Sequence, residues 1–362
     1  MSTGKVRVLV VDDSALMRKL IPQILETDDS IEVVGTAMDG NFGLKKIIDL
    51  KPQVVTLDLE MPGMGGLETL KEITRRHRLP VILVSSHTTQ GAAVTLKALS
   101  MGAFDFVAKP ADVSSRMPEI ARELIAKIKA AAQSRGIRIS TPVDLEPPTR
   151  HRKARTTDKR LPARIVAIGV STGGPQSLQY VLSQLPPDFA GSILVVQHMP
   201  EGFTEMFARR LDECSSLVVK EAQSGDLLLA GRVLVCPGNR HLKVKRLPLG
   251  DIAILSDDPR VNGHRPSVDV LFRSVAEEFG ERAIGVIMTG MGEDGATGLG
   301  TIKAAGGMTI AQSEASCVVF GMPKAAIDRG HAMRVVDLDA LANTLQAQCS
   351  DRGASRAGAG QF

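Results

Sequence analysis

Short apolar runs alternate along this chain with segments whose apolar residues recur every three or four positions. In the first third, apolar runs occupy residues 6–11, 32–37, 54–58, 81–86 and 104–109, and helical patterns occupy 14–26, 40–49, 65–77, 90–102 and 119–134. Strands that alternate with helices are typical of an α/β domain with a doubly wound parallel sheet. We therefore predict five βα repeats in this region.

The same alternation resumes in the second half after an interruption. Apolar runs lie at 164–170, 192–197, 232–238, 253–257, 283–290, 308–312 and 331–337, and helical patterns lie at 175–185, 204–214, 267–279, 296–306 and 321–330. The interruption is rich in proline, threonine and basic residues, which indicates an exposed linker. We predict a first domain at 1–132, a linker at 133–163, a second α/β domain at 164–350 and a disordered Gly/Ala/Ser tail at 351–362.

Composition narrows the class of protein. The net charge is only +4 and aromatic residues make up 3% of the chain, which argues against an extended nucleic-acid surface. The four cysteines are widely spaced and contain no CxxC pair, as expected for reduced thiols. We find no signal peptide and no run long enough to span a bilayer, so we expect a cytoplasmic protein without membrane insertion.

Acidic residues follow two of the strands predicted for the first domain. Asp12 and Asp13 come directly after the first strand, and Asp58 ends the third. Strand ends of this kind meet at one edge of a parallel sheet. Three clustered carboxylates need a shared cation, and their hard oxygen atoms suit Mg²⁺. A carboxylate beside such a cation can accept a phosphoryl group.

The joint pattern VVDDS, LDLEMPGMGG, VSS and a Lys-Pro pair resembles the receiver domain of two-component response regulators. The resemblance implies a flavodoxin-like fold, Asp58 as phosphoacceptor, and Asp12, Asp13 and Asp58 as the Mg²⁺ site. It also implies a histidine kinase as phosphodonor. The switch residues it implies are Ser85, with Ser86 as the alternative, Phe106 and Lys109.

Three polar residues of the second domain each stand just past an apolar run. Ser171 follows IVAIGV, His198 follows SILVVQ, and Asp294 lies in the TGMGED segment after AIGVIM. A serine, a histidine and an acid are the parts of a hydrolytic triad. Their position after predicted strands is where an open α/β sheet forms its sites. These residues predict acyl-transfer chemistry.

Alternatives stay open at this point. The STGG segment also fits a Rossmann-type phosphate loop, although His198 stands where a ribose-binding acid is expected, and it fits a purely structural glycine turn. His264 is the strongest rival histidine, and Glu293 is the alternative acid. The order Ser, His, Asp differs from that of α/β-hydrolases, which excludes that superfamily but not the chemistry.

The segments IVAIGVSTGGP, VVQHMPEGFT, HRPSVDVLF, VIMTGMGEDGATG and ASCVVFGMPKAA resemble the catalytic domain of CheB-type chemotaxis methylesterases. The resemblance implies a Rossmann-like three-layer domain, the triad Ser171, His198 and Asp294, and a site lined by Thr172 and Met291. It implies hydrolysis of glutamate γ-methyl esters, and deamidation of glutamines, on the cytoplasmic helices of chemoreceptors. It implies no cofactor for the hydrolase. A response regulator whose second domain only binds a partner is the alternative.

Overall fold

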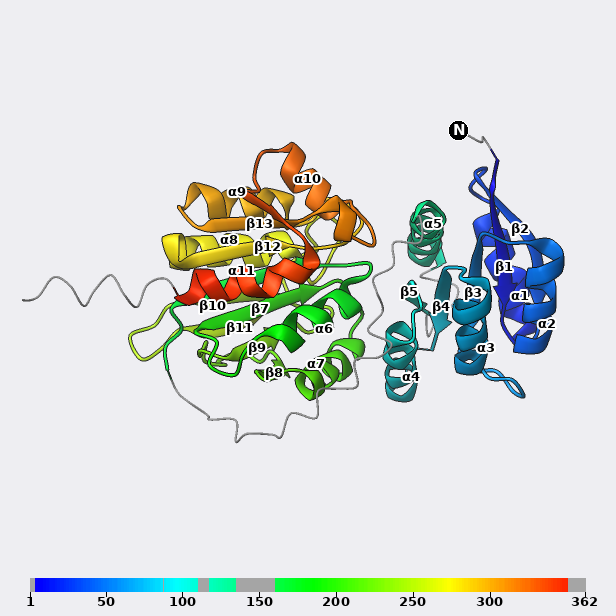
Figure 1. Ribbon diagram of the computed structural model, residues 1–362, viewed down its shortest axis with the longest axis horizontal. Helices are drawn as coiled ribbons and strands as arrows, with labels where there is room; N and C mark the ends of the chain where they lie inside the picture. The colour runs from blue at the N-terminus through cyan, green and yellow to red at the C-terminus, as the bar shows by residue number, and fades with distance from the viewer. Residues whose placement is uncertain (1–3, 87, 110–116, 135–159, 351–362) are drawn as a thin grey trace, which may run out of the picture. The chain divides into compact units, whose positions relative to one another are not determined.

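The computed structural model describes residues 4–86, 88–109, 117–134 and 160–350 (Figure 1). The chain divides into two compact units, one on each side of residue 143. Most of the predicted linker, at 135–159, and the whole predicted tail at 351–362 lie outside the described residues. The limits of the linker and the tail therefore stay predictions.

The first unit is a five-stranded parallel sheet with helices between its strands (Figure 1). Its elements are β1 (Val6–Val11), α1 (Ala15–Leu25), β2 (Ile31–Ala37), α2 (Gly40–Leu50), β3 (Val54–Asp58), α3 (Gly66–Glu72), β4 (Val81–Ser85), α4 (Thr89–Ser100), β5 (Asp105–Ala108) and α5 (Met117–Gln133). The strand order β2-β1-β3-β4-β5 is that of the flavodoxin-like fold, with its topological switch between β1 and β3.

Apolar burial and helix caps explain these elements. Alternate residues of β1, among them Val8 and Val10, pack with Leu25 of α1 and Ile128 of α5 in one fully buried cluster. Ser14, Asp39 and Thr88 cap α1, α2 and α4 by accepting a hydrogen bond from a backbone N–H in the first turn. The pattern at 65–77 predicts one helix, whereas the structure continues α3 as a π-helical turn at Ile73–His77.

The second unit has a seven-stranded parallel sheet in the order β14-β13-β12-β6-β7-β9-β8. Its strands are β6 (Arg164–Val170), β7 (Gly191–Gln197), β8 (Val218–Glu221), β9 (Arg232–Val235), β12 (Ala283–Ile287), β13 (Met308–Gln312) and β14 (Arg334–Val336). Its helices are α6 (Gly174–Gln184), α7 (Phe203–Cys214), α8 (Val268–Phe279), α9 (Ala296–Ala304), α10 (Met322–Asp328) and α11 (Leu338–Ser350). Both units thus confirm the predicted parallel α/β class.

Four elements of the second unit differ from the sequence expectation. The strand expected at 253–257 is β11 (Ile252–Ser256), which pairs antiparallel with β10 (His241–Lys245) outside the parallel sheet. Neither β8 nor β10 was expected, because β8 is short and β10 has two separate apolar residues in place of an apolar run. Helix α11 was also missed, although its buried residues recur with helical spacing.

Helices cover the two faces of the seven-stranded sheet. Ile165 and Ala167 of β6 face a buried cluster that includes Leu271 and Phe272 of α8 and Leu299 of α9. On the other side, α6 packs beside α7 and α11 (Figure 1). Among the described residues, no helix is long and apolar enough to cross a membrane. The sheet order reverses at β6, so the carboxyl ends of β6, β7 and β12 flank the topological switch point.

Candidate functional site

The carboxyl end of β6 places Ser171 between the ends of two neighbouring strands. The His198 N–H donates to the Val170 carbonyl at 3.1 Å, which holds the residue after β7 against the last residue of β6. On the other side, the Ser171 N–H donates to the carbonyl of Thr289, just after β12, at 3.0 Å. The register of three parallel strands therefore gathers the Ser171, His198 and TGMGED loops at one edge of the sheet.

His198 and Asp294 form a hydrogen-bonded pair at this edge. The Nε2 atom of His198 lies 2.9 Å from Oδ2 of Asp294. The imidazole is 11% exposed and the carboxylate 1% exposed. Because an ionised carboxylate can only accept, Nε2 carries the proton of this hydrogen bond, and Nδ1 is left as the basic nitrogen.

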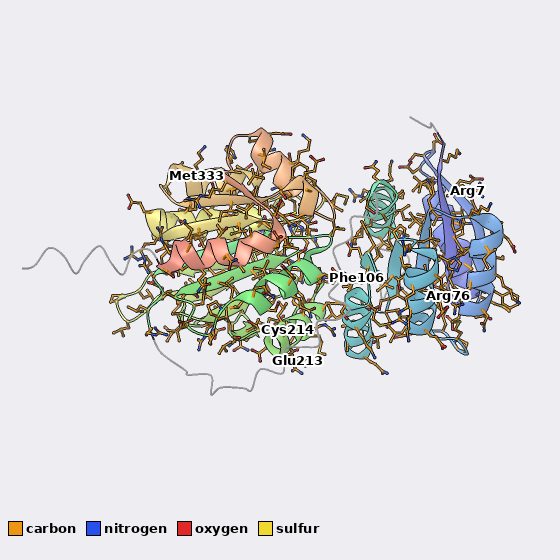
Figure 2. The ribbon with its side chains drawn as sticks, in the orientation of Figure 1. Arg7, Arg76, Phe106, Glu213, Cys214 and Met333 are labelled. Carbon is orange, nitrogen blue, oxygen red and sulfur yellow. The ribbon has the colours of Figure 1, made fainter. Side chains whose placement is uncertain are left out.

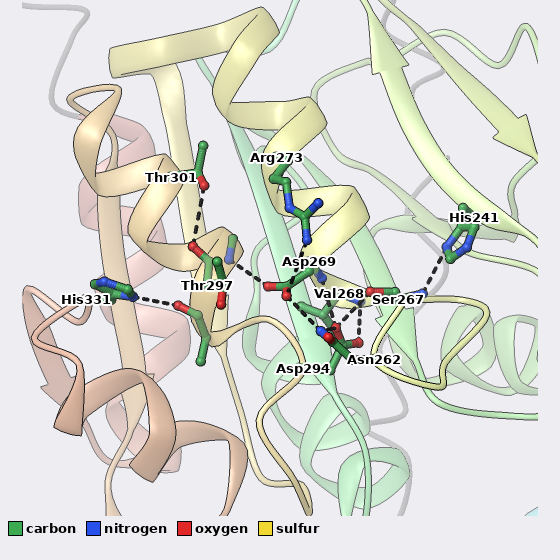
Figure 3. Close-up of polar contacts among 12 residues, drawn as sticks. His241, Asn262, Ser267, Val268, Asp269, Arg273, Asp294, Thr297, Thr301 and His331 are labelled. Carbon is green, nitrogen blue, oxygen red and sulfur yellow. Dashed lines mark hydrogen bonds and ion pairs between the residues drawn. The ribbon is translucent and has the colours of Figure 1, made fainter. Parts of the chain in front are cut away.

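Asp294 accepts hydrogen bonds from four further groups (Figure 3). The Val268 N–H donates at 2.7 Å and the Ser267 hydroxyl at 2.8 Å, while the Asn262 amide and the Asp269 N–H donate at 3.2 and 3.3 Å. Burial alone would raise the pKa of Asp294, but these donors and His198 outweigh it and hold the pKa well below its usual range. The carboxylate of Asp294 is therefore charged.

Ser171 is not hydrogen-bonded to the imidazole in this state. Across the described ranges, no hydrogen bond joins its hydroxyl to His198, and Nδ1 of His198 is buried without a hydrogen-bond partner. A buried lone pair without a donor is costly unless it serves a reaction. Hydroxyl contacts of this kind are often loose in the absence of substrate, so the arrangement is compatible with a serine whose proton passes to Nδ1.

The glycines around Ser171 allow a close approach of backbone segments. A Cβ atom on Gly290 would stand 2.8 Å from Cβ of Ser171 and 2.3 Å from Sδ of Met322. Gly173 caps α6 at a φ of 76°, in the left-handed region that favours glycine. Glycine at these two positions therefore lets the loops after β6 and β12 come together.

Thr172 and Met291 lie in the two loops that flank the serine. Thr172 is buried, and its carbonyl accepts a hydrogen bond from the Thr289 hydroxyl at 2.9 Å. Within the part of the chain that the structure describes, the backbone N–H groups of Thr172 and Met291 donate no hydrogen bond. Unpaired N–H groups beside a nucleophile are suited to bind an oxyanion.

The rival residues of the sequence analysis have other positions. Glu293 is exposed and pairs with Arg329 at 2.5 Å, so it does not reach the imidazole. His264 stacks on His198, with ring centroids 4.0 Å apart and ring planes 3° from parallel. A further histidine, His241, is fully buried in β10, where its Nδ1 accepts a hydrogen bond from the Ser267 N–H and its Nε2 contacts the Pro259 carbonyl.

The first unit gathers its acidic residues as the strand ends predict. Ligand oxygens of Asp12, Asp13 and Asp58 all lie within 4.8 Å of one another, so they could hold a metal ion. Asp12 Oδ2 is buried and accepts no hydrogen bond, although Lys109 Nζ lies 3.2 Å from it. An all-oxygen donor set of three carboxylates fits a hard divalent cation.

Lys109 forms an ion pair with Asp58. Its Nζ lies 2.7 Å from Asp58 Oδ2. Burial raises the pKa of Asp58, and Lys109 opposes this shift without cancelling it. Burial alone would lower the pKa of Lys109, but Asp58 and Asp12 raise it instead. The ammonium therefore supplies positive charge at the place where a phosphoryl group on Asp58 would lie.

The predicted switch residues lie in β4 and β5 or directly after them. The buried Ser85 hydroxyl accepts a hydrogen bond from Thr95 of α4 at 2.5 Å, whereas the Ser86 hydroxyl donates to Glu60 at 2.6 Å. Phe106, labelled in Figure 2, is buried, with 4% of the residue exposed. Pro110, which follows Lys109, lies outside the described residues.

Comparison with known proteins decides the family. The CheB methylesterase family model matches residues 166–345, and the response regulator receiver domain model matches residues 8–120. The protein-glutamate methylesterase/protein-glutamine glutaminase 2 of Koribacter versatilis is 61% identical over 353 residues, which cover 96% of this chain and 97% of that protein. The chain belongs to the CheB-type methylesterase family.

Two further relatives support membership in the CheB-type family. The protein-glutamate methylesterase/protein-glutamine glutaminase of Symbiobacterium thermophilum is 48% identical over 350 residues, or 94% of this chain and 96% of that protein. The crystal structure of the Thermotoga maritima CheB methylesterase catalytic domain is 42% identical, with a TM-score of 0.51, and covers 52% of this chain and 99% of that chain. The second unit therefore has the fold of a CheB catalytic domain.

Sequence reasoning missed two polar residues at the site of this CheB-type chain. Gln197, the last residue of β7, is buried and donates through Nε2 to the carbonyls of Ser171 at 3.0 Å and His198 at 3.2 Å. Asn262 contacts Asp294 from the segment before α8. A signal existed for each, since glutamine is unusual at the end of an apolar strand and an Asn-Gly pair predicts a tight turn.

Proposed function

We propose that this chain is a phosphorylation-activated serine hydrolase that removes methyl groups from glutamate γ-methyl esters of chemoreceptors and deamidates specific glutamines. The observation that carries the proposal is the charged, buried Asp294 hydrogen-bonded to His198 beside Ser171. A binding module has no need of a histidine held by a carboxylate and left with an unpaired basic nitrogen. The names of the relatives supply the substrate class.

In the proposed reaction, Ser171 is the nucleophile. Its hydroxyl oxygen attacks the ester carbonyl while Nδ1 of His198 takes its proton, and Asp294 stabilises the resulting imidazolium. The backbone N–H groups of Thr172 and Met291 receive the negative charge on the carbonyl oxygen. The tetrahedral intermediate then collapses, the carbon–methoxyl bond breaks, and His198 gives its proton to the departing methanol.

Water completes the reaction with the same groups. His198 removes a proton from a water molecule, the water oxygen attacks the acyl carbon, and Ser171 leaves with the proton from His198. The products are glutamate and the free enzyme. A glutamine side chain passes through the same steps, with ammonia as the leaving group. The hydrolytic steps use only residues of the chain and need no cofactor.

For regulation, we assign the receiver to residues 1–132 and the catalytic domain to 164–350. Asp58 accepts the phosphoryl group from a chemotaxis histidine kinase, and Asp12, Asp13 and Asp58 would hold Mg²⁺. When bound, the cation neutralises charge on the phosphoryl oxygens. Lys109 pairs with the phosphorylated side chain, and Ser85 and Phe106 are the switch residues. A substrate on the cytoplasmic helices of receptors places the activity in the cytoplasm.

Methanol release from methylated receptor membranes tests this proposal. The full chain should release methanol, and a small phosphodonor with Mg²⁺ should increase the rate. Ser171→Ala should abolish release, whereas Ser183→Ala, a matched change on α6 that follows the loop, should leave it intact. Equal release by the wild type and Ser171→Ala would show that the serine is not the nucleophile. No release by the wild type under any condition would overturn the proposed function.

A further inference from the structure

A two-residue turn approaches the His198–Asp294 pair with two different side chains. Val261 and His264 exchange both backbone hydrogen bonds, at 3.0 and 2.9 Å, so that Asn262 and Gly263 form the turn between them. Both turn residues have positive φ, 53° and 80°. This is the geometry of the tight hairpin turn that Asn-Gly sequences favour.

The first side chain of the turn reaches the acid. Nδ2 of Asn262 donates to Oδ1 of Asp294 at 3.2 Å and to Oδ2 of Asp269 at 2.9 Å (Figure 3). Asp269 is itself fixed, because its Oδ1 accepts the Gly298 N–H at 2.6 Å. The amide thus ties the carboxylate of Asp294 to a second, anchored carboxylate, and its two hydrogens face two anions that would otherwise repel each other.

The second side chain of the turn reaches the base. The His264 ring lies parallel to that of His198 at 4.0 Å. A single hydrogen bond through Nε2 leaves the His198 ring free to tilt about the bond to Asp294. A flat neighbour on one face removes this freedom. The plane of the imidazole, and with it the direction of Nδ1 toward the serine, is then defined.

We propose that the turn at Val261–His264 is a positioning element for the hydrolytic pair, in which Asn262 fixes the carboxylate of Asp294 and His264 fixes the ring plane of His198. Asn262 acts through Asp294, and His264 acts through His198. The inference deepens the proposed function and rests on it. Its prediction is specific: both side chains set the turnover number, and neither sets the binding of the receptor.

Asn262 is tested with two substitutions that separate the amide from the turn. Asn262→Gly keeps a residue that tolerates positive φ and removes the amide, whereas Asn262→Ala also strains the turn. Asp294 retains its bonds to Ser267 and Val268, so both variants should fold. We expect kcat for methanol release to fall about ten- to a hundredfold in both, with KM unchanged. Wild-type kcat in Asn262→Gly would overturn the role of the amide.

The role of the His264 ring face is tested with one substitution that keeps a flat ring and one that removes it. His264→Phe retains a flat face against His198, and His264→Ala removes it. We expect His264→Ala to lose kcat about tenfold or more at unchanged KM, and His264→Phe to recover most of the loss. Equal activity of all three proteins, or an equal loss in both variants, would overturn the role of the ring face.

A readout without turnover distinguishes failure of this inference from failure of the proposed function. In the full chain with ¹⁵N-labelled histidine, the Nε2 proton of His198 should give a downfield resonance that Asp294→Asn removes. Asn262→Gly and His264→Ala should shift or broaden it, and His264→Phe should restore its position. An unchanged resonance in both Asn262→Gly and His264→Ala would overturn the inference, whatever the substrate of the enzyme.

Discussion

Nε2 of His198 lies 2.9 Å from Oδ2 of Asp294, and both residues come from loops at the carboxyl edge of the same parallel sheet. The contact joins residues 96 positions apart in the sequence. It also fixes which nitrogen of the imidazole is basic. The carboxylate accepts a hydrogen bond from the protonated Nε2, so Nδ1 is the nitrogen that can take the proton of Ser171 in the proposed reaction. The chemistry that we propose for the site rests on this relationship.

Replacement of Asp294 by asparagine should nearly abolish turnover. The amide cannot stabilise a protonated His198, and it can hold the ring in the wrong tautomer, so we expect kcat to fall by about 10³- to 10⁴-fold. Methanol release from methylated receptor membranes measures the effect. The neighbouring acid Glu293 is exposed and paired with Arg329, so Glu293→Gln is the matched control. A similar loss in both variants would contradict the assignment of Asp294.

The depressed pKa of Asp294 predicts how stability depends on pH. Its folded-state pKa lies below the unfolded value of about 3.9. The stabilisation by the charged form is therefore fully present above the unfolded pKa and is lost as pH falls toward the folded pKa. The melting temperature of the wild type should exceed that of Asp294→Asn at pH 7, and the difference should shrink below pH of about 4. A difference that grows in acid would contradict the direction of this shift.

The strand ends could be predicted from the sequence, and the contacts between loops could not. Each of Asp12, Asp58, Ser171 and His198 follows an apolar run, and parallel pairing alone brings such positions to one edge. Asn262 was missed because its contact with Asp294 depends on how a loop folds back over the sheet edge.

The β10–β11 hairpin was missed for a related reason. The apolar run at 253–257 has the same local pattern as a parallel strand, and only its long-range partner decides the sheet to which it belongs. His241 is the first residue of β10, and lysines follow it two and four positions later. Its complete burial could therefore not be predicted from the neighbouring residues. The local pattern of apolar residues therefore predicts where a strand lies in the sequence, and long-range pairing between strands decides which strands are its neighbours.

Asp58→Asn should remove the response to a phosphodonor. The amide cannot accept a phosphoryl group, so the ratio of the methanol-release rates with and without phosphodonor and Mg²⁺ should fall to one. Asp49→Asn, an exposed change on α2 of the same unit, is the matched control and should retain the wild-type ratio. Normal stimulation of Asp58→Asn would show that another residue is the phosphoacceptor.

A methyl group on Gly290 should disrupt the site more than one on Gly292. At Gly290 it would stand 2.8 Å from Cβ of Ser171, so overpacking should cost about 1–3 kcal/mol and displace Ser171. At Gly292 nothing lies within 4 Å, and the cost comes only from the φ of 86°. Gly290→Ala should therefore lower kcat far more than Gly292→Ala does, although the melting temperatures of the two variants should fall by a comparable amount. Equal activity in the two alanine variants would contradict close contact between the two loops.

Thr95 should oppose the movement of Ser85, the residue that we propose as a switch. Its hydroxyl oxygen lies 2.5 Å from Ser85 Oγ and 2.7 Å from the Gly91 carbonyl oxygen, and these contacts hold Ser85 toward α4. Ser85 must leave this contact before it can bind a phosphoryl group on Asp58. Thr95→Val keeps the shape and removes the hydroxyl, so half-maximal stimulation should need less phosphodonor than in the wild type. Ser85→Ala removes the same contact by deleting the other hydroxyl. Because this variant also loses the proposed switch hydroxyl, stimulation by the phosphodonor should weaken. A higher phosphodonor requirement in Thr95→Val would show that the contact assists the switch rather than restrains it.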